Sequence, residues 1–269
     1  MRVNVIVSTF IVSASMVTIA APAQSPADAV KPVSRAQLVK MSAGERLRYN
    51  GGWIYSAPTG KVIRVVSAQK VVPASVLDPM IDGFKVTMGL TLFPTNITQG
   101  STFDVVKRGL AIPMTGAVLA LIDDSDAPRI LCAPEEAWAA VNVRALSIDK
   151  PETDVLEKRI VKESWRALSI ALGAFDTNYR PCLLAPIHTL KDLDSNPSMV
   201  VSPEPFTKMM DNAEKLGIGR VKKTSYRKAC YEGWAPPPKN VYQQAIWDMV
   251  HAMPTAPIKI KPETKKVRE

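Results

Sequence analysis

The stretch Lys162–Gly173, with the sequence KESWRALSIALG, decides the fold that we expect for this chain. It ends a longer segment, Asp154–Gly173, in which apolar residues recur at helical spacing. These residues are Ile160, Val161, Trp165, Leu168 and Leu172. The spacing predicts a helix of about five turns that packs one apolar stripe against a core. Gly173 follows the last apolar residue, where a left-handed glycine commonly ends a helix.

The segments on either side predict one core of mixed helices and strands. Runs of β-branched and apolar residues predict strands at Lys61–Gln69, Leu90–Ile97, Ala117–Ile122, Arg129–Ala133 and Trp138–Val143. Helical spacing predicts helices near Ser34–Arg48, after Pro73, and at Thr189–Asp194, Pro205–Leu216 and Val241–Met253. Ala117–Ile122 is apolar throughout, which is typical of a strand covered on both faces. We therefore expect an α+β protein.

The N-terminus has the layout of a secretory signal peptide. The basic Arg2 precedes an apolar run that ends near Ala21, and Ala21-Pro22-Ala23 offers a cleavage site. A membrane span would need about 20 strongly apolar residues, whereas this run contains several serines and threonines. We expect cleavage after Ala23, export to the periplasm or the extracellular space, and no stable membrane span afterwards.

The chain is basic, with a formal net charge of +9 at pH 7. Part of this excess lies in residues 257–269, PIKIKPETKKVRE, and short basic ends are usually solvated rather than binding grooves. Nucleic-acid binding would need basic residues interleaved with stacking aromatics along one face, and no such stripe is evident in the sequence. We expect no nucleic-acid partner. Weak attraction to anionic glycans or membranes remains open.

Composition divides the chain into four segments. We predict a signal peptide over 1–23, an N-terminal extension over 24–60, a core over 61–219, and a C-terminal arm with a basic tail over 220–269. The run Pro236-Pro237-Pro238 is a stiff, extended connector within that arm.

Three cysteines are too few for a disulfide scaffold, and no C-x-x-C metal motif is present. Cys132 lies in an apolar run and resembles a buried strand residue. If one bridge forms in an oxidising compartment, Cys182 and Cys230 are the favoured pair.

Lys162–Gly173 resembles the metal-binding helix of the archaemetzincins, whose pattern is KE-x-x-HE-x-x-H-x-x-G. Lys162-Glu163 and Gly173 match that pattern without a gap. Cys182-Leu183-Leu184 is similar to the family's cysteine-x-Met turn, and the resemblance extends over about 61–200. It implies a metzincin-like architecture: a twisted mixed sheet, a cleft, and a long helix beneath, with a helical C-terminal appendage added here.

The departures from the pattern concern the chemistry. The two metal histidines of the helix become Arg166 and Ile170, and the general-base glutamate becomes Ala167. The third histidine position is occupied by Asp176. A catalytic zinc needs three protein ligands and a base, and arginine, alanine and isoleucine cannot supply them. We expect no metal, no cofactor and no catalytic residue, and we call Glu163, Arg166, Ala167, Ile170 and Asp176 the vestigial cleft positions.

Several residues have a structural and a functional interpretation. In the structural interpretation, Glu163 and Arg166 form an exposed i,i+3 ion pair. In the functional one, Arg166 projects into the former cleft and binds an anion. Asp123, Asp124 and Asp126 indicate a turn, and less often a calcium site. His188 is expected in a loop. The tryptophans are expected in the core, with Trp234 the best candidate for a docking residue.

These observations favour an exported, non-catalytic protein that acts as a binding or structural factor for an unknown protein or envelope component. We favour the interpretation that the protein is not an enzyme. A secreted hydrolase that uses Asp176, His188 or the acidic residues 123–126 is the alternative. A further option places the interaction function in residues 220–269.

Overall fold

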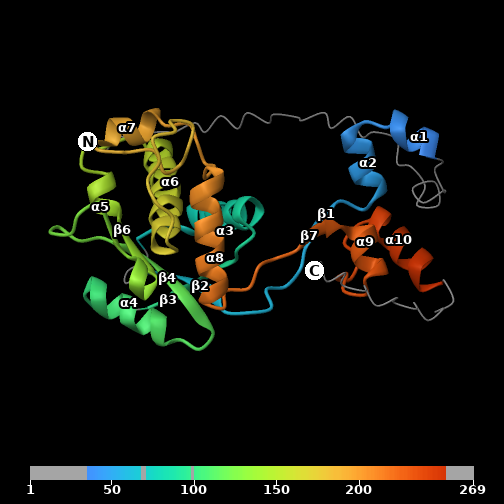
Figure 1. Cartoon of the computed structure of the whole chain (residues 1–269), viewed down its shortest axis with the longest axis horizontal. Coiled ribbons are helices and arrows are strands. Elements are labelled where there is room, and N and C mark those ends of the chain that lie inside the picture. The colour runs from blue at the N-terminus through green and yellow to red at the C-terminus, as the bar shows by residue number, and fades with distance from the viewer. Residues whose placement is uncertain (1–34, 68–70, 98–99, 253–269) are drawn as a thin grey trace, which may run out of the picture. The chain divides into compact units, whose positions relative to one another are not determined.

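The computed structural model describes residues 35–67, 71–97 and 100–252, and the predicted signal peptide and basic tail lie outside these ranges. The chain divides into two compact units. We call Ile54–Thr224 the larger unit, and residues 35–53 with 225–252 the smaller unit (Figure 1). The larger unit is continuous in sequence, whereas the smaller unit combines both ends of the described chain.

The larger unit is built on a five-stranded sheet with the order β3-β2-β4-β6-β5. Its strands are β2 (Val62–Ser67), β3 (Leu92–Asn96), β4 (Thr115–Ile122), β5 (Ile130–Ala133) and β6 (Trp138–Asn142). Strands β3, β2, β4 and β6 are parallel to one another, and β5 pairs antiparallel with β6 at one edge. β4 is buried along nearly its whole length, as its apolar sequence predicts.

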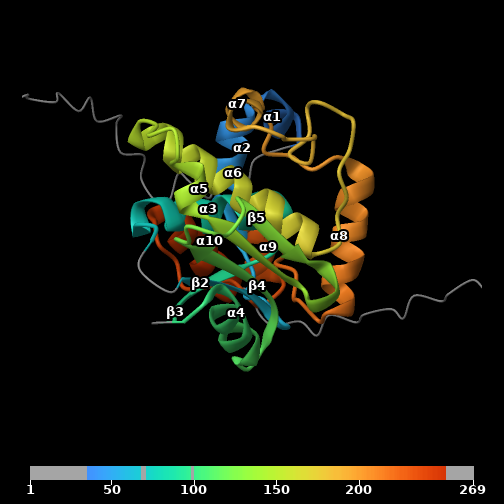
Figure 2. The same ribbon diagram turned by 90° about the vertical axis from the view of Figure 1, so that its left-hand side faces the viewer.

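Helices cover both faces of this sheet, as Figure 2 shows for α4 and α6. They are α3 (Ala74–Met88), α4 (Thr102–Ala111), α5 (Val143–Leu146), α6 (Thr153–Ala171), α7 (Leu190–Ser195) and α8 (Pro203–Lys215), with the 3-10 turn η2 (Pro134–Glu136) before β6. A small apolar cluster lies under α4. The main core lies on the other face, under α3 and α6.

The long helix α6 is the centre of that main core. Trp165 packs edge-to-face on Phe84 of α3, with ring centroids 5.5 Å apart, and its indole N–H donates to the Met80 carbonyl at 3.2 Å. The helix ends close to the predicted position, and Gly173 has the left-handed φ of +86°. The predicted α+β class, with a twisted mixed sheet and a long helix beneath it, is confirmed.

Two helices of the larger unit were not predicted, the short α5 and the longer α4. Residues 102–111 form α4, although the sequence analysis finds no element between the strand ending near residue 97 and Ala117. The local signal is a capping box, in which Ser101 and Asp104 satisfy each other's backbone N–H groups.

The smaller unit is helical, with α1 (Arg35–Lys40), α2 (Ala43–Tyr49), α9 (Tyr226–Tyr231) and α10 (Val241–His251). Tyr226 and Ile246 are fully buried and form its centre. The chain passes between the units within β1 (Trp53–Tyr55) and β7 (Lys223–Ser225), which pair with each other.

Long-range polar contacts hold the two chain segments of the smaller unit together. The Gln243 side-chain amide donates to the Gly51 carbonyl at 2.9 Å, and Arg227 donates to the Tyr49 carbonyl at 3.1 Å. The extension and the arm, which the sequence analysis treats as separate segments, therefore contribute to one unit.

No helix among the described residues is long and apolar enough to cross a bilayer.

Candidate functional site

The candidate site lies on the side of α6 that faces the edge strand β5. Glu163, Arg166, Ala167 and Ile170 occupy positions i, i+3, i+4 and i+7, so they lie along one side of the helix. Cys132 of β5 points at this side, with its Sγ 3.5 Å from the Ala167 carbonyl. The structure thus brings four of the five vestigial cleft positions under one strand.

Glu163 is a fully buried carboxylate between two arginines. Arg129 Nε lies 2.8 Å from its Oε1, and Arg166 Nη1 lies 4.0 Å from its Oε2. Neither carboxylate oxygen receives a hydrogen bond of good geometry. Burial raises the pKa of Glu163, and the charges of Arg129 and Arg166 oppose that rise.

Arg166 joins this buried pair to the surface. Its side chain is 5% exposed and its Nη2 donates to Asp176 Oδ1 at 2.9 Å, while the Asp176 side chain is 58% exposed. The positions that the resemblance assigns to the first and third metal ligands therefore bind each other. The prediction of an exposed Glu163–Arg166 pair is wrong, because both side chains are buried beneath β5.

Arg129 is the site residue that the sequence analysis missed. It precedes β5, pairs with Glu163, and donates through Nη2 to the Ile187 carbonyl at 2.9 Å. A carboxylate that is buried on a helix needs a cation nearby. The need of Glu163 for such a partner was the signal that could have led to Arg129. Nothing in the local sequence selects Arg129 from the other basic residues.

The outer edge of β5 is open. Within the described part of the chain no strand pairs with it on that side. The Asn142 N–H donates to the Arg129 carbonyl at 2.9 Å. In this register the backbone N–H and C=O groups of Arg129, Leu131 and Ala133 are directed toward β6. By the antiparallel alternation, the backbone N–H and C=O groups of Ile130 and Cys132 point outward.

The donor set does not fit a zinc ion. Arg166 has no lone pair to donate and is held by Asp176, while Ala167 and Ile170 carry no ligand atom. Nowhere in residues 35–67, 71–97 and 100–252 do three His, Cys, Asp or Glu side chains gather as a metal site would require. Burial raises the pKa of Cys132 to about 11, so this thiol stays protonated near neutral pH.

Of the residues of the alternative hydrolase, Asp176 is bound to Arg166 within this site, whereas among the described residues no hydrogen bond or ion pair joins His188 or the acidic residues 123–126 to it. His188 is exposed in the loop before α7, where its N–H and that of Thr189 donate to Asp192. In the acidic cluster the Asp126 N–H donates to Asp124 Oδ1 at 2.9 Å, which is the turn geometry that the sequence favours. Asp123 is paired with Arg144.

All three cysteines are free thiols. Cys182 belongs to the larger unit, where its Sγ receives the N–H groups of Leu184 and Ser202, and Cys230 belongs to the smaller unit. The predicted Cys182–Cys230 bridge is therefore absent from the structure, because each thiol is buried in the packing of its own unit.

A second hollow, of about 570 Å³, lies on the opposite side of α6. It is bordered by α3, α6 and the segment after α7, and Val76, Val161 and Met199 are among its lining residues. Lys162 closes one end and donates to the Leu193 carbonyl at 2.6 Å. None of the vestigial cleft positions lines it.

No family model and no curated protein matches the chain in sequence. Among solved structures it is similar to archaemetzincin from Methanopyrus kandleri, at 16% identity and a TM-score of 0.48, over 58% of this chain and 96% of that one. It is also similar to a zinc-dependent peptidase from Methanocorpusculum labreanum, at 14% identity and a TM-score of 0.44, over 55% of this chain and 99% of that one. The first belongs to the family that Lys162–Gly173 resembles.

Proposed function

We propose that the protein is exported and acts without catalysis, as a binding factor for an extended peptide segment of a protein or envelope component. The ligand segment pairs with the outer edge of β5, above the Glu163–Arg166 cluster. The Arg166–Asp176 ion pair is the observation that carries the proposal. These two side chains stand at positions where the resemblance expects metal ligands, and they bind each other instead.

The absence of catalysis follows from the charges of the cluster. Peptide hydrolysis on this architecture needs a polarised water and a group that accepts its proton. The side chain at the base position is the methyl group of Ala167, and the buried carboxylate of Glu163 is neutralised by Arg129 and Arg166. The cluster carries as many positive as negative charges, and it stabilises the helix–strand contact.

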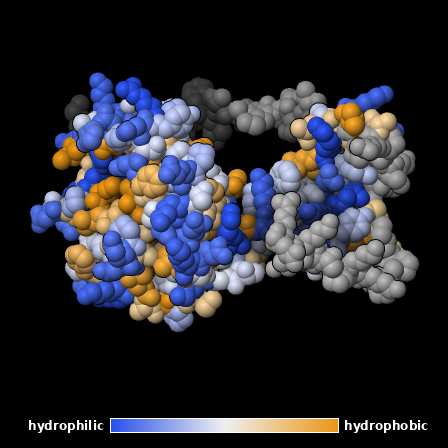
Figure 3. Space-filling model, viewed as in Figure 1, coloured by the Kyte–Doolittle hydropathy of each residue, from blue (hydrophilic) through white to orange (hydrophobic). Residues whose placement is uncertain are grey.

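The binding role follows from the open edge. An unpaired strand edge presents N–H and C=O groups that another extended chain can satisfy, and peptide recognition commonly uses this mode. β5 is only four residues long, so the paired segment is short. On the face drawn in Figure 3, apolar residues form small areas among hydrophilic ones rather than one broad apolar patch.

Catalysis and binding can be tested on one sample of the full chain. We expect metal analysis to find no stoichiometric zinc and a random peptide library to remain uncleaved. The same library is then used to select binding peptides. Cleavage that a chelator abolishes would overturn the non-catalytic proposal and favour the hydrolase alternative.

The strand-pairing mode needs a control on the ligand. A selected peptide is N-methylated either on the alternate amides that face β5 or on the intervening set. Strand addition predicts that only one of the two sets abolishes binding. Equal tolerance of both sets would contradict pairing at the β5 edge.

Export is tested by the N-terminal sequence of the protein recovered from its native host. We expect the mature chain to begin at Gln24 and to lie outside the cytoplasm. An intact N-terminus in the cytoplasmic fraction would contradict this part of the proposal.

A further inference from the structure

The smaller unit concentrates the basic charge and the amphipathic aromatic residues of the chain. Its described residues, 35–53 and 225–252, include seven basic and three acidic side chains, against twenty and nineteen in Ile54–Thr224. They also include three of the five tryptophans and four of the six tyrosines, but no phenylalanine. Arginine, tyrosine and tryptophan are the residues that protein interfaces enrich.

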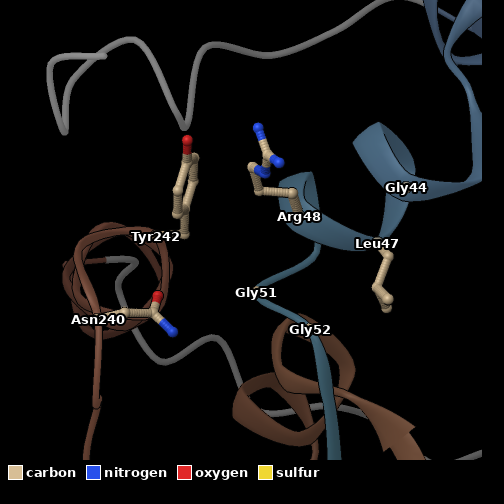
Figure 4. A pocket seen from close by; sticks show the side chains of 7 residues that line it. All are labelled: Gly44, Leu47, Arg48, Gly51, Gly52, Asn240 and Tyr242. Atoms are coloured by element: carbon tan, nitrogen blue, oxygen red, sulfur yellow. The ribbon is translucent and has the colours of Figure 1, made fainter. Parts of the chain in front are cut away.

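A pocket of about 290 Å³ opens within this unit, lined by Gly44, Leu47, Arg48, Gly51, Gly52, Asn240 and Tyr242. Figure 4 shows the side chains of Arg48 from α2 and Tyr242 from α10 extending in the same direction, one on each side of the pocket. Asn240 and the turn formed by Gly51 and Gly52 lie below them. The pocket is therefore assembled from segments that lie almost 200 positions apart in the chain.

The base of the pocket is fixed by buried contacts. Gln243 anchors α10 to the Gly51 carbonyl, and a Cβ at Gly51 would lie only 2.9 Å from the Tyr226 Cβ. Gly51 and Gly52 both have positive φ, which glycine adopts without strain. The turn thus holds the two walls at a set position.

The polar groups at the pocket are hydrogen-bond donors. Asn240 Oδ1 already accepts the Gln243 N–H at 3.0 Å, which leaves the amide nitrogen of Asn240 to donate. Arg48 is exposed, and its guanidinium forms no hydrogen bond with any residue that the structure describes. The charge of Arg48 acts on the nearby Glu45 carboxylate, but the guanidinium does not donate a hydrogen bond to it. Its donors therefore favour a ligand with anionic oxygen atoms.

We propose that this pocket binds an aspartate or glutamate side chain from an acidic segment of a partner protein. The carboxylate pairs with Arg48 and Asn240, and the aliphatic part of the side chain lies against Tyr242. The chain's own residues 253–269 carry a basic excess, so their charge does not complement the pocket.

A nucleic-acid ligand is less well matched to the aromatic residues. Trp247 is stacked on His251 with centroids 4.1 Å apart, and the Tyr49 ring is covered by Arg227 at 4.6 Å. These rings are engaged within the unit, whereas binding of single strands uses rows of rings that bases can stack on.

The test measures the anisotropy of a fluorescein-labelled Ac-GEEEEG peptide with the full chain at low salt. We expect saturable binding, and roughly tenfold weaker binding for Arg48→Ala, as for the loss of one charge-assisted pair. Arg46→Ala is the matched control, because it removes the same charge from α2 without touching the pocket. It should weaken binding by less than about twofold.

Three outcomes would overturn the proposal: no binding of the peptide at low salt, equal losses for Arg46→Ala and Arg48→Ala, or tighter binding of single-stranded DNA or anionic vesicles of matched charge. Arg48 is exposed, so the Arg48→Ala protein should keep its thermal transition. A peptide selected for binding at the β5 edge should not displace the labelled peptide, which separates this inference from the proposed function of that edge.

Discussion

Arg159 and Arg166 of the larger unit contrast with Arg48 of the smaller unit. In the larger unit Arg159 and Arg166 are nearly buried, and each is paired with aspartate. In the smaller unit Arg48 is exposed and lines a pocket. A buried and paired arginine stabilises the structure around it, and its removal leaves carboxylates without partners. An exposed arginine contributes little to stability and remains available to a ligand.

To test this contrast, the largest loss in the free energy of unfolding is expected for Glu163→Leu in the larger unit. The substitution leaves Arg129 and Arg166 without their shared carboxylate, and breaking a buried pair in this way typically costs about 3–5 kcal/mol. Urea unfolding followed by circular dichroism measures the loss. Glu157→Leu on the same helix is the control and should stay within about 0.5 kcal/mol. Similar losses for both would show that the cluster does not stabilise α6.

The next effect is expected in the smaller unit, for Gly51→Ala. A methyl group there is strained by the φ of +75° and meets Tyr226 and Ile246, so we expect a loss of about 2–3 kcal/mol. Gly52→Ala has the same kind of φ with nothing within 4 Å, and should lose about 1 kcal/mol. Hydrogen exchange should accelerate in 35–53 and 225–252 only. Faster exchange throughout 54–224 would break the division into two units.

A smaller loss, of about 2 kcal/mol, is expected for Arg159→Ala. Its guanidinium donates to Asp149, to Asp194 and to the Leu146 carbonyl, and so links α6 to α5, to the loop after α5 and to α7. Both aspartates are partly exposed and can be hydrated, which limits the loss. Lys158→Ala removes an exposed i,i+4 pair next to it and should cost less than about 0.5 kcal/mol. Equal losses would show that burial of Arg159 is irrelevant.

The smallest expected effect is a pH dependence of the difference in stability between wild type and Arg159→Ala. The hydrogen bonds from Arg159 hold the pKa of Asp149 and of Asp194 below the usual value. A lowered pKa in the folded state gives stability that is present above the unfolded-state pKa and is lost as the pH falls through the folded-state pKa. The stability difference between wild type and Arg159→Ala should therefore shrink between about pH 5 and pH 3. A difference that grows on acidification would contradict this assignment.

Local pattern was enough to predict α6 and the strands of the sheet. The observed helix Thr153–Ala171 differs from the prediction by a residue or two at its ends, because the apolar stripe and Gly173 are local signals. The strand at 117–122 was predicted for the same reason, since an unbroken apolar run requires cover on both faces.

The pairing inside the site was not predictable in this way. Helical spacing shows that Glu163 and Arg166 share one side of α6, but whether that side is buried depends on where β5 packs. The pair Arg129–Glu163 is formed across 34 positions, and Gly51 meets Tyr226 across an even longer separation. Such contacts follow from the tertiary arrangement, which the local sequence does not encode on its own.

The crossing of the chain within β1 and β7 has a consequence for synthesis on the ribosome. Residues 54–224 form one uninterrupted stretch, so this part can collapse while the polypeptide is still being translated. Helices α1 and α2 must wait for α9 and α10, which are synthesised only after the whole of the larger unit. Until then their apolar side chains are available to chaperones.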